Sequence, residues 1–312
     1  DLRWEQTTQI NIGVDMVFLK DFTATLEYFN KNTSDMLLDI VVPGYVGNNG
    51  PVGNIASMTN NGVEFELGYN RTIGEFVLDF GGNVSFIQNE VTFLGEDKEF
   101  LPGQVFSPQS LEITRTQVGF PIGFFFGFET DGIFQNQEEV DAYVNDAGEP
   151  LLPDAAPGDF RFVDVNGDGI IDADDRTYLG DPTPDVIYGF TFNASWRQFD
   201  ISIFGQGMAG NQVFNATRRF DLQMSNLTGD ALGRWTGEGT SNTYPRLIMN
   251  DPNQNFSRSS DFYVEDASFF RLRTLQLGYR LPAELASKLF MSNARFYVSA
   301  NNLFTITNYS GF

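Results

Sequence analysis

Apolar and polar residues alternate one by one along several stretches of this chain, and these stretches come in closely spaced pairs. From Val63 to Tyr69 the odd positions are apolar and the even positions are polar, and the alternation returns between Phe76 and Phe86 after a break at Arg71–Glu75. Successive side chains of a β-strand point to opposite faces. The pattern therefore predicts a hairpin with one apolar face and one polar face.

Three further pairs of stretches alternate in the same way, so the sequence predicts eight antiparallel strands. These pairs lie at 10–18 and 22–28, at 188–196 and 199–203, and at 268–280 and 294–304. Their expected turns include Leu19–Asp21 and Arg197–Gln198. In the last pair the apolar positions change from even to odd, which predicts a bulge near Arg273–Thr274. A short helical stretch is expected at Ala283–Leu289, between the last two strands.

The connections on the other side of the strands are long and irregular, at about 32–58, 91–184 and 208–266. A short helix is expected near Gln137–Val144. Short turns at one end and long loops at the other are typical of outer-membrane barrels, whereas a connection as long as 91–184 is uncommon in a compact soluble domain. The predicted fold is all-β, an antiparallel transmembrane β-barrel with long extracellular loops. Eight strands can close a small barrel, but these loops and polar faces suit a wider lumen.

Two aromatic residues flank the tightest predicted turn. Trp196 and Phe199 stand where a membrane barrel places its interfacial aromatic residues. The alternative is a hairpin of a soluble β-sandwich, whose core uses the same residue types.

Composition narrows the class of protein further. Hydrophobic residues make up 41% of the 312 residues, the mean hydropathy is −0.21, and no apolar run is long enough for a spanning helix. This excludes a helical membrane protein and leaves a barrel open. The net charge of −22 disfavours a nucleic-acid partner and, since it gathers in the loops, fits cation binding or an exposed surface.

The chain has no Cys and no His, which removes thiol nucleophiles, disulfides, His–Cys zinc sites and a Ser-His-Asp triad. Glu64, Glu66 and Asp79 could act as an acid–base set, but a wet strand face explains them more simply. The sequence therefore predicts no enzyme.

One loop matches a calcium-binding template. Residues 164–175 read DVNGDGIIDADD, with Gly169 at the sharp sixth position and Ile171 expected to anchor the loop. The predicted ligands of a structural Ca²⁺ are Asp164, Asn166, Asp168, the carbonyl of Ile170, Asp172 and Asp175. The twelfth position is Asp, as in dockerin-type loops, where Glu is usual. The alternative is an ion-free turn held by side-chain to backbone hydrogen bonds.

Aromatic residues in the long connections are candidates for contacting a substrate or a lid. They could stack on sugar rings, or they could simply pack the loops. These residues are Tyr45, Phe106, Phe214, Trp235 and Tyr244.

Several motifs, in order and across nearly the whole chain, resemble the C-terminal part of the SusC/RagA-type TonB-dependent transporters. They are GFPIGFFFGFETDGIF at 119–134, PGDFRFVDVNGDG at 157–169, DRTYLG at 175–180, YGF at 188–190, FGQG at 204–207, YVEDASFFRLRTLQLGY at 263–279 and ANNLF at 300–304.

The resemblance implies a plugged outer-membrane barrel of about 22 strands in a Gram-negative bacterium. Such a barrel actively imports oligomeric nutrients, glycans or peptides, as the SusC-like part of a SusCD-type complex. A SusD-like surface lipoprotein would form the lid, and TonB would supply energy. Residues 1–312 are then expected to be the C-terminal part of the barrel, without the plug, the TonB-binding segment and the early strands.

A rival interpretation from another class is a secreted, calcium-dependent β-sandwich adhesin or glycan-binding module. A third is a carboxylate-based glycosidase, which needs a paired-carboxylate cleft that the sequence does not reveal. Barrel and sandwich differ in what their apolar faces meet, which is lipid in the first and another sheet in the second.

Overall fold

A computed structural model describes residues 2–39, 47, 50–95, 98–105, 112–219 and 226–311. The chain divides into two compact units. The sheet unit comprises Asp1–Glu96, Thr183–Asn211 and Asp266–Phe312. The loop unit comprises Asp97–Pro182 and Gln212–Glu265.

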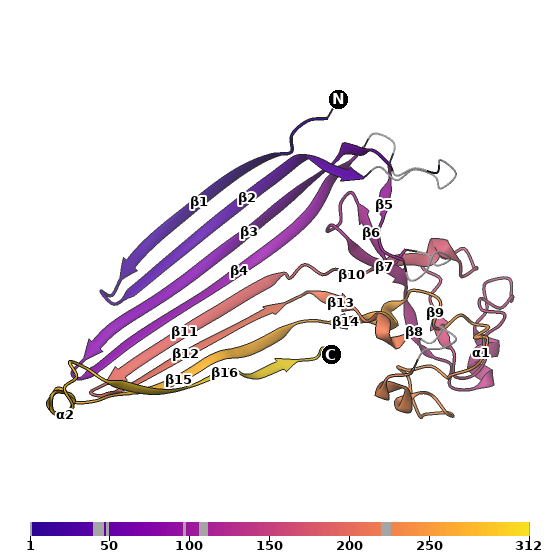
Figure 1. Cartoon of the computed structure of the whole chain (residues 1–312). Helices are drawn as coiled ribbons and strands as arrows, with labels where there is room; N and C mark the ends of the chain where they lie inside the picture. Colours follow the sequence, from indigo (N-terminus) through magenta and orange to yellow (C-terminus); the bar gives the residue numbers. More distant parts are fainter. Residues whose placement is uncertain are drawn as a thin grey trace. The chain divides into compact units, whose positions relative to one another are not determined.

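The sheet unit is one antiparallel sheet of eight strands, as the alternation predicts (Figure 1). Along the sheet the order is β1 (Gln6–Phe18), β2 (Phe22–Asp39), β3 (Val52–Ile73), β4 (Phe76–Leu94), β11 (Val186–Trp196), β12 (Phe199–Ala209), β15 (Phe269–Arg280) and β16 (Arg295–Thr307). Neighbouring strands of the sheet follow one another in the sequence, with two interruptions. The two segments of the loop unit stand in the sequence between β4 and β11 and between β12 and β15, which still pair with each other. Three short turns and the β15–β16 connection therefore lie at one end of the strands, and the other connections lie at the opposite end.

The turn between β1 and β2 falls where the sequence predicts it. Leu19 and Lys20 both have positive φ, 50° and 67°, which gives the turn type whose twist matches that of a two-stranded ribbon. In the β3–β4 turn the predicted five-residue break is shorter, because pairing runs to Ile73 and Phe76 and leaves only two residues between the strands.

Most strands are longer than their alternation predicts, β2, β3 and β4 most of all. β2 continues to Asp39 and β3 begins at Val52, so much of the loop expected at 32–58 is sheet; β4 likewise continues to Leu94. The alternation marks only the stretch with an apolar face. Beyond it, backbone pairing continues the ladder, with Asp39 opposite Val52, and polar side chains also bond across it, as Thr59 does to Asn32 at 2.6 Å.

The predicted irregularities are confirmed. The register of β15 shifts between Leu272 and Thr274 against both neighbours, so Arg273 is the bulged residue. The helix between β15 and β16 is α2 (Ala283–Lys288), and the one expected near Gln137 is α1 (Gln137–Ala142). In the part of the chain that the structure describes, neither helix has the length and apolar character to cross a membrane.

The loop unit contains small sheets around an aromatic core. One sheet joins β5 (Phe100–Pro102), β6 (Thr114–Gln117), β7 (Phe124–Phe128) and β10 (Arg176–Gly180), while β8 (Thr130–Ile133) pairs with β9 (Phe160–Phe162) and β13 (Gln212–Phe214) with β14 (Val264–Asp266). The buried core draws on distant segments, among them Phe134, Phe162, Phe256 and Tyr263. Much of the segment expected as irregular at 91–184 and 208–266 is therefore folded.

Candidate functional site

The register of the sheet unit places apolar side chains on one face across all eight strands. Ile12, Tyr28 and Val63 stand opposite one another on β1, β2 and β3, and Ile203, Leu275 and Ala300 do so on β12, β15 and β16. This face is exposed within the described structure: Ile12 is 65% accessible and Val298 76%. An exposed apolar face of this extent needs a partner other than water, and within the described sheet unit no second sheet packs against it, as one would in a sandwich.

Aromatic residues form a row across this face near the short turns. The row has two parts, because Tyr69 of β3 stands opposite Phe80 of β4 and not opposite Phe76. The first part comprises Phe18, Phe22 and Tyr69 on β1 to β3, and the second comprises Phe76, Trp196, Phe199, Tyr279 and Phe296 on β4 to β16. Several neighbouring rings touch, with centroids 5.4 Å apart for Phe18–Phe22, 5.6 Å for Phe76–Trp196 and 5.0 Å for Phe199–Tyr279. Trp196 and Phe199, at their predicted positions, thus belong to an aromatic series that runs from β4 to β16, as at a membrane interface.

The opposite face is polar and its side chains are joined across strands. Asp79 of β4 accepts hydrogen bonds from Asn70 of β3 (3.2 Å) and Asn193 of β11 (3.0 Å). Ser202 of β12 donates to the Asn193 carbonyl oxygen at 2.7 Å. Four strands are therefore linked by one ladder of polar side chains, which satisfies groups that an apolar surface would leave unpaired.

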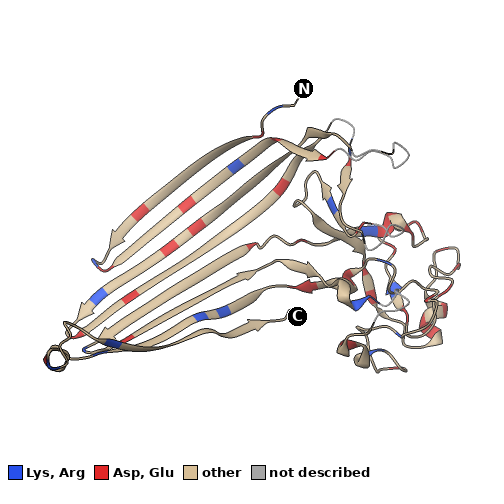
Figure 2. Cartoon of the chain, viewed as in Figure 1, with Lys and Arg blue, Asp and Glu red and all other residues tan. Residues whose placement is uncertain are grey.

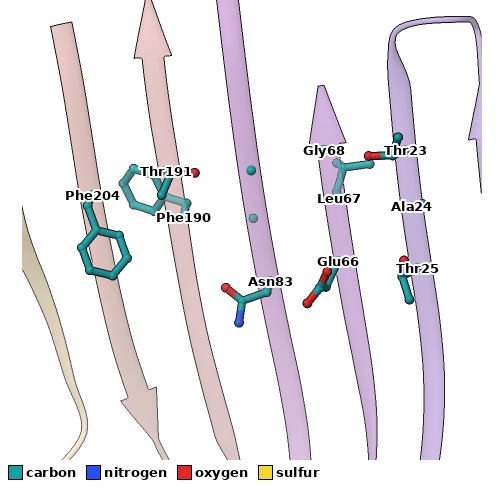
Figure 3. A pocket seen from close by; sticks show the side chains of 12 residues that line it. Thr23, Ala24, Thr25, Glu66, Leu67, Gly68, Asn83, Phe190, Thr191 and Phe204 are labelled. Carbon is teal, nitrogen blue, oxygen red and sulfur yellow. The ribbon is translucent and has the colours of Figure 1, made fainter. Parts of the chain in front are cut away.

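A hollow of about 320 Å³ lies on the polar face beside this ladder. It forms because Gly68 of β3 and Gly81 of β4 stand directly opposite each other without side chains. A Cβ at Gly68 would collide with the Thr23 hydroxyl, and one at Gly81 would lie 3.0 Å from that of Thr191. The side chains around the hollow come from five strands: Thr23, Thr25, Glu66, Asn83, Thr191 and Phe204 (Figure 3).

Acidic residues outnumber basic ones along the first four strands (Figure 2). Glu27 of β2 stands directly opposite Glu64 of β3, and Glu66 lies two positions along the strand. Like charges placed opposite each other are destabilising. Solvent or a cationic group facing this wall would relieve the repulsion, which suits a water-filled lumen.

One ion pair crosses a whole strand on the polar face. Arg295 of β16 reaches over β15 to Asp200 of β12, with Nε 2.9 Å from Oδ1 and Nη2 bonded to Oδ2. The strand between them contributes Gly278, and a Cβ there would lie 2.5 Å from both Arg295 Nη2 and Asp200 Oδ2.

Replacing Gly278 with alanine should therefore break this pair and slightly lower the unfolding temperature of the sheet. The comparison is Gly13→Ala on the same face, where the nearest atom to the new Cβ lies 3.6 Å away. We expect the Gly13 variant to unfold in detergent at or above the temperature of the parent, and the Gly278 variant below it. Equal unfolding temperatures for the two variants would show that the pair contributes nothing.

The loop at 164–175 folds around its own backbone. Asp164 accepts hydrogen bonds from the N–H groups of Gly167 (2.7 Å) and Gly169 (2.8 Å). Asp175 is fully buried and accepts from Val165 and Asp172 at 2.9 and 2.8 Å. These are the bonds of the ion-free alternative.

Other features of the loop agree with the calcium template. Gly169 has a φ of +85°, and Ile171 is 7% accessible within the core of the loop unit. Among the described residues, however, no three or more acidic, His or Cys side chains gather as a metal-ligating group. With its carboxylates turned onto backbone N–H groups, this arrangement is not a ready cation cage. Calcium binding by Asp164, Asn166, Asp168, Ile170, Asp172 and Asp175 stays a prediction.

The candidate loop aromatics have different surroundings. Tyr244 is 6% accessible and belongs to the core of the loop unit, and Phe214 and Trp235 are partly buried against that core. Tyr45 and Phe106 lie outside the described residues. Packing accounts for the position of the three described rings, and contact with a substrate or lid stays a prediction.

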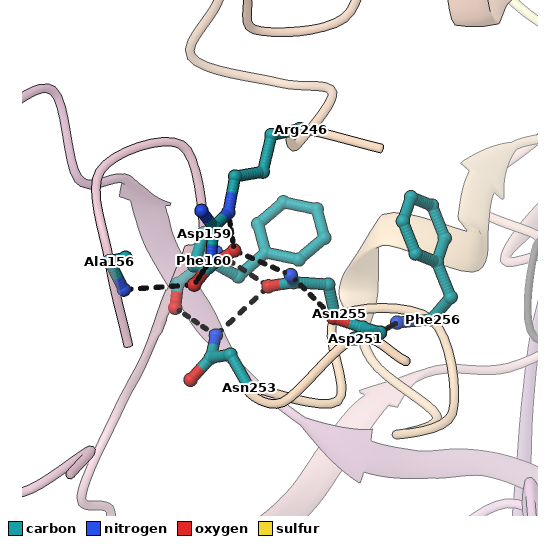
Figure 4. Close-up of polar contacts among 8 residues, drawn as sticks. All are labelled: Ala156, Asp159, Phe160, Arg246, Asp251, Asn253, Asn255 and Phe256. Atoms are coloured by element: carbon teal, nitrogen blue, oxygen red, sulfur yellow. Dashed lines mark hydrogen bonds and ion pairs between the residues drawn. The ribbon is translucent and has the colours of Figure 1, made fainter. Parts of the chain in front are cut away.

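A buried polar network in the loop unit has no counterpart in the sequence analysis (Figure 4). Fully buried Asp159 accepts from Arg246 Nε and Nη2 at 2.7 and 2.9 Å, and from Asn255 Nδ2 at 2.9 Å. Asn255 also donates a hydrogen bond to Asp251. Burial raises the pKa of the Asp251 carboxyl above its usual range, although hydrogen bonds from Phe256 and Asn255 act to lower it. In the sequence, the polar residues of 246–255 lie within the long connection at 208–266, and nothing in their spacing predicts that they meet Asp159.

A second cluster of the loop unit stacks arginine between aromatic rings. The guanidinium of Arg115 lies 3.7 Å from the ring centre of Phe100 and 3.5 Å from that of Phe126. Glu112 pairs with Arg115 at 2.6 Å and with Arg176 at 3.2 Å. Burial raises the pKa of the Glu112 carboxyl, but the two arginines and a backbone N–H outweigh it, and the pKa is lowered.

Comparison with known proteins places these features in a family. The family model described as "TonB dependent receptor-like, beta-barrel" matches residues 1–303. The chain is similar to TonB-dependent receptor P26 of Formosa agariphila, with 32% identity over 97% of this chain. It is also similar to TonB-dependent receptor SusC of Bacteroides thetaiotaomicron, with 24% identity over 100% of this chain. It spans 30% of the length of each.

Among solved structures, the chain is similar to the RagAB peptide transporter, with a TM-score of 0.75 and 25% identity. The match covers 99% of this chain and 32% of that one. The sheet is therefore part of a larger barrel, its apolar face meets the lipid of the outer membrane of a Gram-negative bacterium, and its polar face lines the interior. The chain belongs to the TonB-dependent receptor family, as part of the family's β-barrel domain.

Proposed function

We propose that the complete protein imports oligomeric nutrients across the outer membrane, and that the polar face of this sheet lines their path. The observation that carries the proposal is the division of eight strands into an exposed apolar face and a hydrogen-bonded polar face with a hollow at Gly68 and Gly81. No covalent step is needed, because passage requires only a wet surface inside an apolar shell.

The finer parts of the proposal rest on the relatives. One is named SusC, and another belongs to a complex named a peptide transporter. They support a SusCD-type assembly with a SusD-like surface lipoprotein as lid, TonB as energy source, and a glycan or a peptide as cargo.

The test uses the full-length protein in its native membrane. We expect it in the outer-membrane fraction, and we expect detergent pull-down to recover a surface lipoprotein. Deleting its gene should abolish growth on one oligosaccharide or peptide from a panel, and restoring the gene should restore growth. A soluble protein, or unchanged growth and uptake across the panel, would contradict the proposal.

We also propose that the 164–175 loop binds Ca²⁺ as a structural ion, with Asp168 and Asp172 turning toward it. The left-handed Gly169 and the buried Ile171 support this proposal. An ion that binds only the folded loop stabilises it, by about 2.7 kcal/mol when its concentration is 100 times the dissociation constant.

Calcium should accordingly slow hydrogen exchange of residues 164–175 in the full-length protein, relative to EDTA. Asp168→Ala should abolish the difference, whereas Asp154→Ala, at an exposed site outside the loop, should preserve it. Identical exchange with calcium and with EDTA in the parent protein would rule the ion out.

A further inference from the structure

The connection between β15 and β16 differs from the other turns at its end of the sheet. The turns β1–β2, β3–β4 and β11–β12 contain two or three residues, whereas residues 281–294 separate β15 from β16 and include α2 (Figure 1). Shorter connections close the neighbouring hairpins, so hairpin geometry alone does not require this length.

This connection exposes large apolar side chains. Phe290 is 100% accessible, Leu289 56%, and Leu285 and Met291 47% each, while Ala286 of the same helix is fully buried. Phe290 moreover has a φ of +56°, a left-handed conformation that is unfavourable for a bulky residue. The Met291 N–H donates to the Ala286 carbonyl at 3.0 Å, so the left-handed Phe290 closes the end of α2. The four apolar side chains themselves stay exposed in the described structure.

The lipid-facing surface of the sheet continues into this connection. Tyr279 and Phe296, the last members of the aromatic row, stand opposite each other on β15 and β16. The Leu281 N–H donates to the Ala294 carbonyl at 2.8 Å, which extends the ladder two residues beyond the row. At about 3.3 Å per residue, the connection begins roughly 7 Å past the aromatic row, within the headgroup layer of a bilayer.

The connection carries few charges. Lys288 lies in the last turn of α2, whereas Arg295, where the connection rejoins the sheet, is paired with Asp200 on the polar face. Glu284 is the single acidic residue among residues 280–295. A short segment with exposed apolar side chains and a lysine beside them is of the kind that lies in the plane of a membrane interface.

We propose that Leu285, Leu289, Phe290 and Met291 insert at the headgroup–acyl boundary of the membrane leaflet on the turn side, with Lys288 beside lipid phosphates. In this arrangement the β15–β16 connection fixes its end of the barrel at the membrane interface through inserted apolar side chains. This anchoring is independent of what the protein transports.

The test places a nitroxide spin label at position 290 of the full-length protein in phosphatidylethanolamine–phosphatidylglycerol vesicles. The chain has no Cys, so Phe290→Cys adds a unique label once any cysteine elsewhere in the protein is replaced by serine. The fully exposed side chain makes no contact whose loss would unfold the protein. The matched control is Lys20→Cys, in the exposed β1–β2 turn at the same end.

We expect the label at 290 to be several-fold more accessible to oxygen than to a water-soluble nickel chelate, and the label at 20 to show the reverse. Equal chelate accessibility at the two positions would place the connection in water and overturn the proposal. Protection of position 290 from both reagents would also overturn it, because another part of the protein would then cover the site.

Discussion

Replacing Ile203 with arginine should destabilise the folded barrel in a bilayer by about 2–4 kcal/mol, because the charge would face lipid near the middle of the membrane. Ile203 lies on the apolar face of β12, opposite Phe192 and Leu275. It is four residues from Phe199 of the aromatic row, which at about 3.3 Å per residue is roughly 13 Å. That distance is about half of an apolar band of roughly 25 Å.

Gln276→Arg provides the matched control. Gln276 of β15 adjoins Leu275, the partner of Ile203, but lies on the polar face opposite Ser202. A charge there meets water, so its cost should be close to zero. Both variants of the full-length protein can be folded into lipid vesicles across a urea titration and the folded fraction measured. Equal losses for the two variants would mean that the faces are assigned the wrong way or that the sheet does not face lipid.

Replacing Asp159 with alanine should destabilise the loop unit by about 3 kcal/mol. The carboxylate is fully buried and bonded to Arg246, Asn255 and the Ala156 N–H. Removing one partner of a buried pair costs about 3–5 kcal/mol, since the other charge is left unpaired. The Arg246 side chain is 23% accessible and can turn partly to water, which places the expected value at the lower end.

The control for Asp159 is Asp131→Ala. Asp131 also forms an ion pair, with Arg161 at 2.8 Å, but its side chain is 73% accessible. Exposed pairs contribute less than about 1 kcal/mol. Hydrogen exchange of the full-length protein should show faster exchange of Phe160 and residues 253–256 in the Asp159 variant only. Unchanged protection there would mean that the aromatic core alone holds these segments.

The sequence revealed the two faces of the sheet and the packing of the loop unit to different degrees. The faces were predictable because each strand carries its own alternation, whatever its neighbours are. The Asp159 network was not, because Asp159, Arg246 and Asn255 are up to 96 residues apart and each alone looks like a surface residue. The calcium-loop template at 164–175 was predictive in part. It placed the left-handed Gly169 and the buried Ile171 correctly, while calcium binding stays a prediction.

By itself, the sequence determined the strands with an apolar face, the turn at Leu19–Asp21, the bulge at Arg273 and the helix of the last hairpin, because each follows from spacing within a few residues. Only the tertiary structure decided how far β2 and β3 extend past their alternation, since backbone pairing leaves no side-chain pattern. It also decided which residues meet across strands. The hollow at Gly68 and Gly81, the Asp200–Arg295 pair over Gly278 and the aromatic row all depend on register between strands, and register is a property of neighbours rather than of any one segment.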